Sequence, residues 1–122
     1  MLTVFEVANP FTPALNVDAP LENAISIFSR SQLRALPVVR EGVFCGVLER
    51  HSMELGLIHN GTTVRDVFSR DTVFLSPRDA AQDAADLLAI GVVDMIPIVT
   101  AGGCLAGIVT QNDLPPSMRH RN

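Results

Sequence analysis

The sequence predicts an α+β fold in which two β-α-β-β-α repeats pack around a pseudo-twofold axis. The first observation is internal repetition, because Thr3–Val7 aligns with Thr63–Val67, 60 residues further along the chain. The second is that Leu36–Val39 aligns with Ile96–Val99 at the same spacing of 60 residues. The third is that short β-branched runs alternate with segments whose apolar residues recur at helical spacing.

We expect the two repeats to cover residues 1–60 and 61–122. Neither repeat is long enough to close a core by itself, so the two must pack together as one module. Each repeat is expected to open with a short helical turn, which starts at Thr3 in the first repeat and Thr63 in the second and carries an acid at its fourth position. A short strand rich in apolar residues is expected to follow, over 14–17 in the first repeat and 72–75 in the second. A helix is expected to follow each of these strands.

The boundaries of these helices are predicted from residues that favour helix ends. In the first repeat Pro20 suits the first helical position, and Asp18 is a candidate cap. In the second repeat Ser76 is expected to cap a helix that starts at Pro77. Gly91 is a fitting end for that helix, since glycine readily adopts the left-handed conformation of a C-terminal cap.

Two further strands are predicted to form a hairpin in each repeat. In the second repeat the apolar runs Met95–Val99 and Gly107–Val109 flank a turn that contains Gly102-Gly103. The second strand ends at Thr110, where a helix cap belongs, and Asp113 follows three residues later. A hydroxyl and a carboxylate are therefore expected on one small surface.

Thr110 and Asp113 admit two interpretations. In the first, both side chains only satisfy the free amides of a helix start. In the second, they bind a ligand that carries a vicinal diol and a phosphate. A carboxylate accepts two hydrogen bonds from the hydroxyls of a ribose, while a hydroxyl and free amides hold a phosphate. The local pattern alone leaves both interpretations open.

The composition limits the classes of function. The chain has 122 residues, 48% of them hydrophobic, a net charge of −4 and no lysine among its nine basic residues. No apolar run approaches the ~20 residues that span a bilayer, and Met1–Glu6 lacks the features of a signal peptide. We therefore expect a cytoplasmic protein. The negative charge argues against nucleic acid as a main partner, and the absence of lysine excludes Schiff-base chemistry.

Neither a metal site nor a catalytic site is indicated by the residue pattern. Cys45 and Cys104 lie far apart and are expected to be small core residues. His51, His59 and His120 are scattered, and none is spaced from a carboxylate as in a zinc site. There is no nucleophile elbow and no phosphate-binding glycine loop before a helix. We therefore expect no enzyme, no metal and no cofactor.

The two-copy layout, the Pro-containing strands Leu36–Val39 and Ile96–Val99, and the motif Gly107–Asp113 resemble a tandem pair of cystathionine-β-synthase (CBS) domains, known as a Bateman module. The resemblance extends from Thr3 to Leu114. It implies a regulatory module that binds AMP, ADP, ATP or S-adenosylmethionine in the cleft between the repeats. It also implies a homodimer, and a regulated enzyme or transporter outside this chain. The alternative is a dimerisation and assembly module whose nucleotide pockets are vestigial and unoccupied.

The resemblance also implies which residues bind the ligand, because the acidic motif of one repeat faces the first strand of the other. The implied set is Thr110, Asp113, Ile108, Ala8, Phe11, Pro13, Leu33 and Arg34. Phe11, Pro13 and Leu33 would wall the adenine, and Arg34 would pair with a phosphate. The ordinary alternatives are core packing for Phe11 and Leu33 and a solvated surface cation for Arg34.

The first repeat departs from the family motif. Its counterparts of the ligand-binding residues form a degenerate second site that comprises Glu49, Ser52, Asp94 and Val73. Glu49 would place a carboxylate where a phosphate is received, next to Asp94, which is the counterpart of Arg34. Like charges this close in a partly dry cleft repel by something on the order of 1–4 kcal/mol. Arg50 and His51 are candidates to offset that charge. We expect one competent site and one degenerate site.

A second departure follows the motif of the second repeat. Leu114 is followed by Pro115 and Pro116, and proline disfavours helical geometry in the residue before it. The helix expected over 52–58 in the first repeat is therefore either restarted at Pro115 or missing in the second. The polar tail 117–122 is expected to be frayed.

Overall fold

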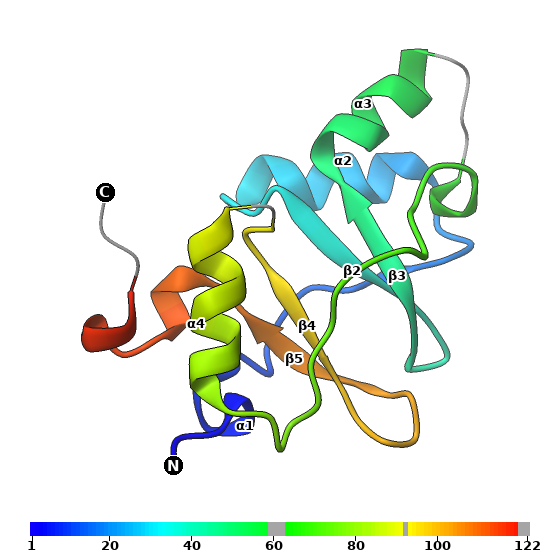
Figure 1. Ribbon diagram of the computed structural model, residues 1–122. Coiled ribbons are helices and arrows are strands. Elements are labelled where there is room, and N and C mark those ends of the chain that lie inside the picture. The colour runs from blue at the N-terminus through cyan, green and yellow to red at the C-terminus, as the bar shows by residue number, and fades with distance from the viewer. Residues whose placement is uncertain (59–62, 92, 120–122) are drawn as a thin grey trace. The chain divides into compact units, whose positions relative to one another are not determined.

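The computed structural model describes residues 1–58, 63–91 and 93–119 (Figure 1). The chain divides into two compact units. The central unit is Pro13–Thr72, and the terminal unit joins Met1–Thr12 to Val73–Asn122. The units do not coincide with the sequence repeats, because the segment that opens the first repeat belongs to the same unit as most of the second. Both units mix helices and strands, which confirms the predicted α+β class.

The central unit contains a three-stranded sheet with the order β1-β2-β3. Strand β1 runs parallel to β2, and β2 pairs antiparallel with β3. The elements of this unit are β1 (Leu15–Asn16), α2 (Leu21–Arg30), β2 (Ala35–Arg40), β3 (Val43–Glu49), α3 (Arg50–Ile58) and the 3₁₀ turn η1 (Val64–Asp66). Helix α2 buries Leu21, Ala24 and Phe28, which recur at helical spacing, in the same core as Leu36 and Leu48 of the hairpin.

The terminal unit is built around the hairpin of β4 and β5. Its elements are α1 (Val4–Val7), α4 (Ala81–Ile90), β4 (Ile96–Val99), β5 (Leu105–Val109) and the 3₁₀ turns η2 (Gln111–Asp113) and η3 (Pro116–Met118). The predicted hairpin is confirmed. The strand predicted over 72–75 is reduced to one parallel bridge between Leu75 and Ile98. Val99 N–H donates to the carbonyl of Leu75 at 2.8 Å.

The predicted start of the first long helix is wrong by one position. Helix α2 begins at Leu21, and Pro20 is the N-cap residue with extended backbone angles. Asp18 does not cap the helix. Its carboxylate instead accepts hydrogen bonds from Nε and Nη2 of Arg65, at 3.1 and 2.6 Å. The carboxylate therefore joins the start of α2 to η1.

The predicted start of the second long helix is also wrong, whereas its end is confirmed. Helix α4 begins at Ala81, after a turn in which Ser76 N–H donates to the carboxylate of Asp79 at 2.7 Å. Asp79 takes the role of a local turn acceptor, so the helix starts after it. Gly91 ends α4 with φ of 83°, the left-handed conformation expected of a C-terminal glycine.

Two equivalent segments close the edges of the two hairpins. We call Thr3–Asn9 the leading arm and Thr63–Ser69 the linker arm. Asn9 exchanges backbone hydrogen bonds with Ile108 of β5, at 2.8 and 3.1 Å. Ser69 does the same with Val47 of β3, and both bonds are 2.9 Å long. Each hairpin is thus extended by the arm that opens the other sequence repeat.

Glycine permits this close approach in both units. A Cβ on Gly107 would lie 2.7 Å from the carbonyl oxygen of Asn9, and one on Gly46 would lie 2.1 Å from that of Ser69. Contacts this short do not occur between real Cβ and backbone atoms. The glycine that opens each Gly-x-x-Thr-type motif is therefore required by the arm that crosses it.

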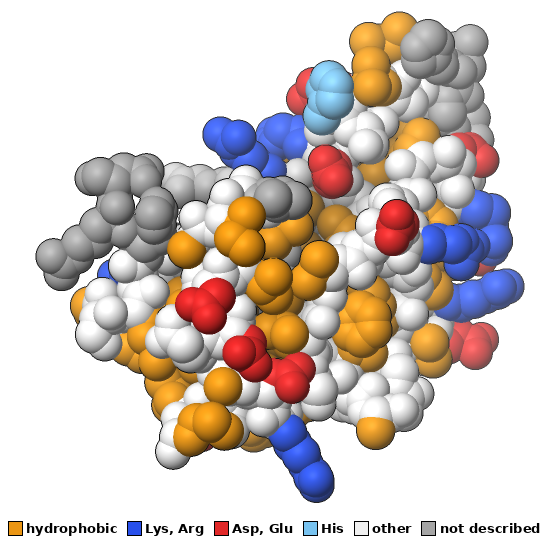
Figure 2. Space-filling model, in the orientation of Figure 1, with side chains coloured by type: hydrophobic (Ala, Val, Ile, Leu, Met, Phe, Trp, Pro, Cys, Tyr) orange, Lys and Arg blue, Asp and Glu red, His pale blue; other side chains and the backbone are white. Residues whose placement is uncertain are grey.

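The surface places several apolar side chains in solvent. On α3 the exposed fractions are 45% for Leu55, 40% for Leu57 and 72% for Ile58, and hydrophobic side chains gather at that end of the helix in Figure 2. Cys45 is half-buried, but Cys104 is exposed beside the β4–β5 turn, so the core position predicted for Cys104 is wrong. None of the helices in the described ranges is both long and apolar enough to cross a bilayer.

Candidate functional site

The turn after β5 brings Thr110 and Asp113 together. The backbone N–H and the hydroxyl of Thr110 both donate to Oδ2 of Asp113, at 2.8 and 3.0 Å. Both residues are half-buried. Within the described residues Oδ1 of Asp113 accepts no hydrogen bond. The first interpretation, a capping role, is therefore realised by one carboxylate oxygen, while the other remains able to accept from a ligand.

The same Thr-x-x-acid pattern is found at the start of both arms. Glu6 accepts from the N–H and hydroxyl of Thr3, at 3.1 and 3.0 Å. Asp66 accepts from those of Thr63, at 3.1 and 3.2 Å. The hydrogen bonds of these two capping boxes are exposed. Those of the capping box formed by Thr110 and Asp113, at the end of β5, are half-buried. Capping geometry alone therefore does not single out a binding site, but burial distinguishes the Thr110 box from the other two.

Three of the predicted ligand-binding residues lie in the terminal unit together with Thr110 and Asp113. Ile108 is buried in β5, two residues before Thr110. Ala8 ends α1 as its C-cap and packs against the core of this unit. Phe11 is 91% exposed, and its N–H donates to the side-chain oxygen of Asn9 at 3.0 Å. The core-packing alternative for Phe11 is thus wrong, because its ring lies in solvent.

The other predicted ligand-binding residues lie in the central unit. Pro13 is exposed at its beginning, and Leu33 packs at the edge of its core. Arg34 directly precedes β2 and is exposed. A site that joins these three residues to Thr110 and Asp113 stays a prediction.

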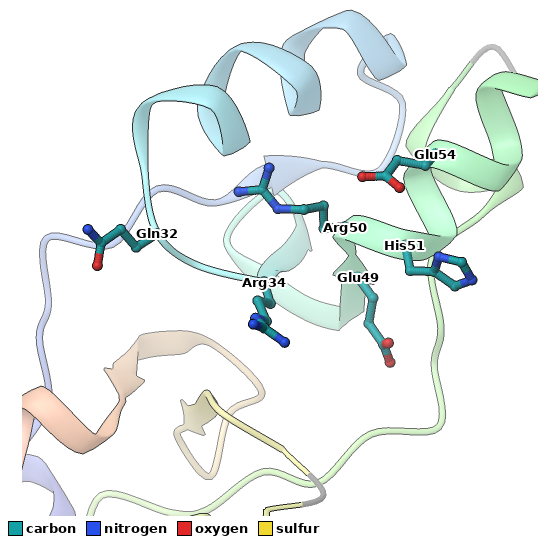
Figure 3. A pocket seen from close by; sticks show the side chains of 6 residues that line it. All are labelled: Gln32, Arg34, Glu49, Arg50, His51 and Glu54. Carbon is teal, nitrogen blue, oxygen red and sulfur yellow. The ribbon is translucent and has the colours of Figure 1, made fainter.

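The central unit has a hollow of its own at the place of the degenerate motif (Figure 3). Strands β2 and β3 bring together the two chain segments that line the hollow, one before β2 and one after β3. Ala35 pairs with Glu49, and the N–H of Arg50 donates to the carbonyl of Arg34 at 2.8 Å. The lining residues are Gln32, Arg34, Glu49, Arg50, His51 and Glu54. Charges of both signs therefore face one polar hollow.

Arg50 has a structural role that the sequence did not predict. Its Nη2 donates to the carbonyls of Phe28, Ser31 and Leu33, at 2.8, 3.4 and 3.2 Å. The guanidinium also lies over the Phe28 ring, 5.0 Å from its centroid. Figure 3 shows it turned toward α2, whereas Arg34 and Glu49 point to the opposite side. Arg50 thus caps the C-terminal end of α2, and those contacts occupy the Nη2 group expected to offset Glu49.

The remaining residues of the degenerate site are divided between the units. Glu49 is exposed at the end of β3, and Ser52 is half-buried in α3. Asp94 is exposed and Val73 is 40% exposed, both in the terminal unit. The described parts of the chain hold no group of three or more His, Cys, Asp or Glu side chains placed to bind a metal ion.

Comparison with known proteins identifies the family. The CBS domain model matches the chain twice, over residues 4–53 and 64–114. The chain belongs to the CBS domain family. Each match covers most of one repeat. It contains the Pro-containing strand of that repeat and the glycine that opens its motif, Gly46 or Gly107.

Individual relatives share this CBS pair. The CBS domain-containing protein YhcV of Bacillus subtilis is 32% identical over 98 residues, which are 77% of this chain and 69% of YhcV. The inosine-5'-monophosphate dehydrogenase of Thermoplasma acidophilum is 24% identical over 100 residues, 82% of this chain but only 20% of the dehydrogenase. The chain thus spans about a fifth of that enzyme.

Among solved structures, CBSX2 of Arabidopsis thaliana in complex with AMP has a TM-score of 0.81 to this chain and 21% sequence identity. The match covers 93% of both chains. At this level of identity the likeness establishes the fold, namely a pair of CBS repeats.

Proposed function

We propose that the chain is a regulatory module that binds an adenosine-type nucleotide at the turn of Thr110 and Asp113. The observation that carries the proposal is the half-buried Asp113 carboxylate, in which Oδ2 is held by Thr110 and Oδ1 has no partner among the described residues. A fixed carboxylate with one available oxygen suits the hydroxyls of a ribose. The complex of the related CBSX2 with AMP supports this ligand class.

The rest of the motif suits the phosphate end of the same ligand. Thr110 precedes the turn η2, and its hydroxyl, which donates to Asp113 in this structure, would turn its proton to a phosphate oxygen when the nucleotide binds. Backbone N–H groups at such a turn favour an anion. In this proposal Arg34 adds a guanidinium for the phosphate, while Phe11, Pro13 and Leu33 contact the adenine.

We further propose that each chain has one competent site. In the central unit Glu49 replaces the hydroxyl residue and Ser52 replaces the acid of the motif. Arg50, the nearest cation in sequence, is held by the carbonyls of Phe28 and Leu33, at and beyond the C-terminal end of α2. A phosphate at this hollow would meet the carboxylates of Glu49 and Glu54 beside the guanidinium of Arg34. Calorimetry with AMP, ADP, ATP and S-adenosylmethionine should therefore give a stoichiometry of about one per chain, and two equal sites would contradict this part of the proposal.

The direct test exchanges Asp113 for Asn. Asn keeps one oxygen to accept from Thr110, so the turn is retained, but its amide group no longer accepts a ribose hydroxyl. We expect the variant to bind the nucleotide about 1.5–3 kcal/mol more weakly, the range for a hydrogen bond to a charged group. Asp66→Asn makes the same change in an equivalent capping box and should leave affinity unchanged. Equal affinity of the Asp113→Asn variant and the wild type would remove Asp113 from the site.

The alternative function is assembly with vestigial pockets, and the apolar side chains exposed at the end of α3 favour it. A thermal-shift series with adenosine nucleotides separates the two functions. A ligand at a hundred times its Kd adds about 2.7 kcal/mol of stability, which raises the melting temperature by several degrees. If no nucleotide shifts the melting temperature and the chain forms a homodimer at all concentrations, the assembly function is favoured.

A further inference from the structure

The segment after the second motif differs from its counterpart in the first repeat. In the central unit the motif leads directly into the nine-residue helix α3. In the terminal unit it leads into η2 and, after Pro115, into η3, each of three residues. The prediction that Pro115 prevents a continuous helix is confirmed. The fold therefore needs another way to hold the turn that carries Asp113.

The two prolines remove the donors that a helix would supply. In an α-helix the carbonyls of Gln111 and Asn112 would accept from the N–H groups of residues 115 and 116, and proline has none. The carbonyl of Gln111 accepts instead from Leu114 N–H at 3.2 Å. The carbonyl of Asn112 is left without a backbone donor among the described residues.

Arg119 supplies the missing donors from further along the chain. Its Nη2 donates to the carbonyl of Asn112 at 3.2 Å, and its Nε donates to that of Leu114 at 2.9 Å. Leu114 is 1% exposed in the core of the terminal unit, and Met118 packs against the same core. One guanidinium thus spans both sides of Asp113, between two anchors in the core.

We propose that Arg119 is a positioning residue of the nucleotide site. Its guanidinium takes the place of the missing helix and holds η2 in the conformation that presents Asp113 and Thr110 to the ligand. The inference rests on the proposed nucleotide function. It adds that the affinity of the site depends on a side chain beyond the family motif, which acts through two backbone carbonyls and not through contact with the ligand.

The first test concerns the turn without any nucleotide, so it is independent of the proposed function. Amide hydrogen exchange of the full chain should be faster over residues 110–114 in Arg119→Ala than in the wild type. Arg78→Ala is the matched control, since Arg78 is an exposed arginine in the same unit, and it should leave exchange in this segment unchanged. Unchanged exchange in Arg119→Ala would overturn the proposal.

The second test is a double-mutant cycle on AMP affinity, measured by calorimetry well below the melting temperature. We expect Arg119→Ala to weaken AMP binding about tenfold, the equivalent of one lost hydrogen bond. Arg119→Lys keeps a donor for one carbonyl and should restore part of the affinity. In the Asp113→Asn background Arg119→Ala should have less than about a twofold effect, because the group that it positions is already impaired.

The outcomes separate the two proposals. An equal loss of affinity from Arg119→Ala in both backgrounds would show a general structural effect and overturn the positioning role. If the wild type binds none of the nucleotides while exchange responds to Arg119→Ala, the nucleotide function fails and the positioning role for that site fails with it. In that case the exchange data still show that Arg119 stabilises the turn.

Discussion

The sharpest test of the fold is the substitution Gly46→Ala. Gly46 lies in β3 where the linker arm crosses it, and an added Cβ would lie 2.1 Å from the carbonyl oxygen of Ser69 and 3.0 Å from Cδ2 of Phe68. The first contact is with backbone, so no side-chain rotation relieves it. The arm must move away from the strand.

The cost follows from what that movement breaks. Val47 and Ser69 exchange two backbone hydrogen bonds of 2.9 Å, worth about 0.5–1.5 kcal/mol each. Overpacking against Phe68 adds about 1–3 kcal/mol. Replacing glycine with alanine also lowers the conformational entropy of the unfolded chain, which offsets about 0.4–1 kcal/mol of this loss of stability. Taking the middle of each range, we expect the free energy of unfolding to fall by about 2–4 kcal/mol.

Urea denaturation followed by circular dichroism measures this change. With a denaturant slope of about 2 kcal/mol/M, the middle of the usual range, the midpoint should fall by about 1–2 M. The matched control is Gly102→Ala in the β4–β5 turn, where the nearest atom to an added Cβ is Oγ1 of Thr100 at 3.9 Å. That variant should stay within about 0.5 kcal/mol of the wild type. Equal midpoints for the two variants would refute the close approach of the arm.

Two further predictions concern single side chains. Arg50→Ala should lower the free energy of unfolding by about 2–4 kcal/mol, because it removes charged hydrogen bonds and the stacking on Phe28. The exposed Arg40→Ala should change it by less than about 0.5 kcal/mol in the same thermal or urea titration, and equal effects would contradict the capping role. Hydrogen bonds from the N–H and then the hydroxyl of Thr3 hold the pKa of Glu6 below its ordinary value. The stabilising effect of the ionised Glu6 is therefore present above its unfolded pKa and lost as pH falls through the lower folded pKa. An NMR titration should give a low midpoint for Glu6 that rises in Thr3→Val, and a midpoint that does not move would exclude the contribution of the hydroxyl.

Local signals in the sequence predicted most of the secondary structure. The apolar runs around Pro97 and Ile108 and the glycines between them were sufficient for the β4–β5 hairpin, because strand pairing across a short turn is a local event. Gly91 ended its helix as expected for the same reason. The starts of α2 and α4 were predicted wrongly, because Asp18 and Ser76 form other hydrogen bonds that the helix-cap pattern does not distinguish.

The arrangement of the arms could not be predicted in this way. Both arms carry the same Thr-x-x-acid start, and both hairpins offer an edge with a glycine at the crossing point, Gly46 or Gly107. Nothing local determines which arm crosses which edge. For the candidate site, the pairing of Thr110 with Asp113 was predicted from spacing. The role of Arg50 was not, because it depends on the carbonyls of Phe28 and Leu33, which only the folded chain brings near. The role of Arg119 was missed because no helix-end pattern indicates a side chain that donates to Asn112 and Leu114.

The leading arm has a consequence for the order in which the protein assembles. It leaves the ribosome before the central unit, whereas the strand that it pairs with, around Ile108, leaves after that unit. The central unit is one continuous stretch, so all of its contacts are available before the terminal unit can be completed. When the leading arm pairs with β5, it closes a loop of chain that contains the whole central unit. The entropic cost of this closure rises only slowly with loop length. Until then the edge of β5 stays open, which is the state most exposed to mispairing with another chain.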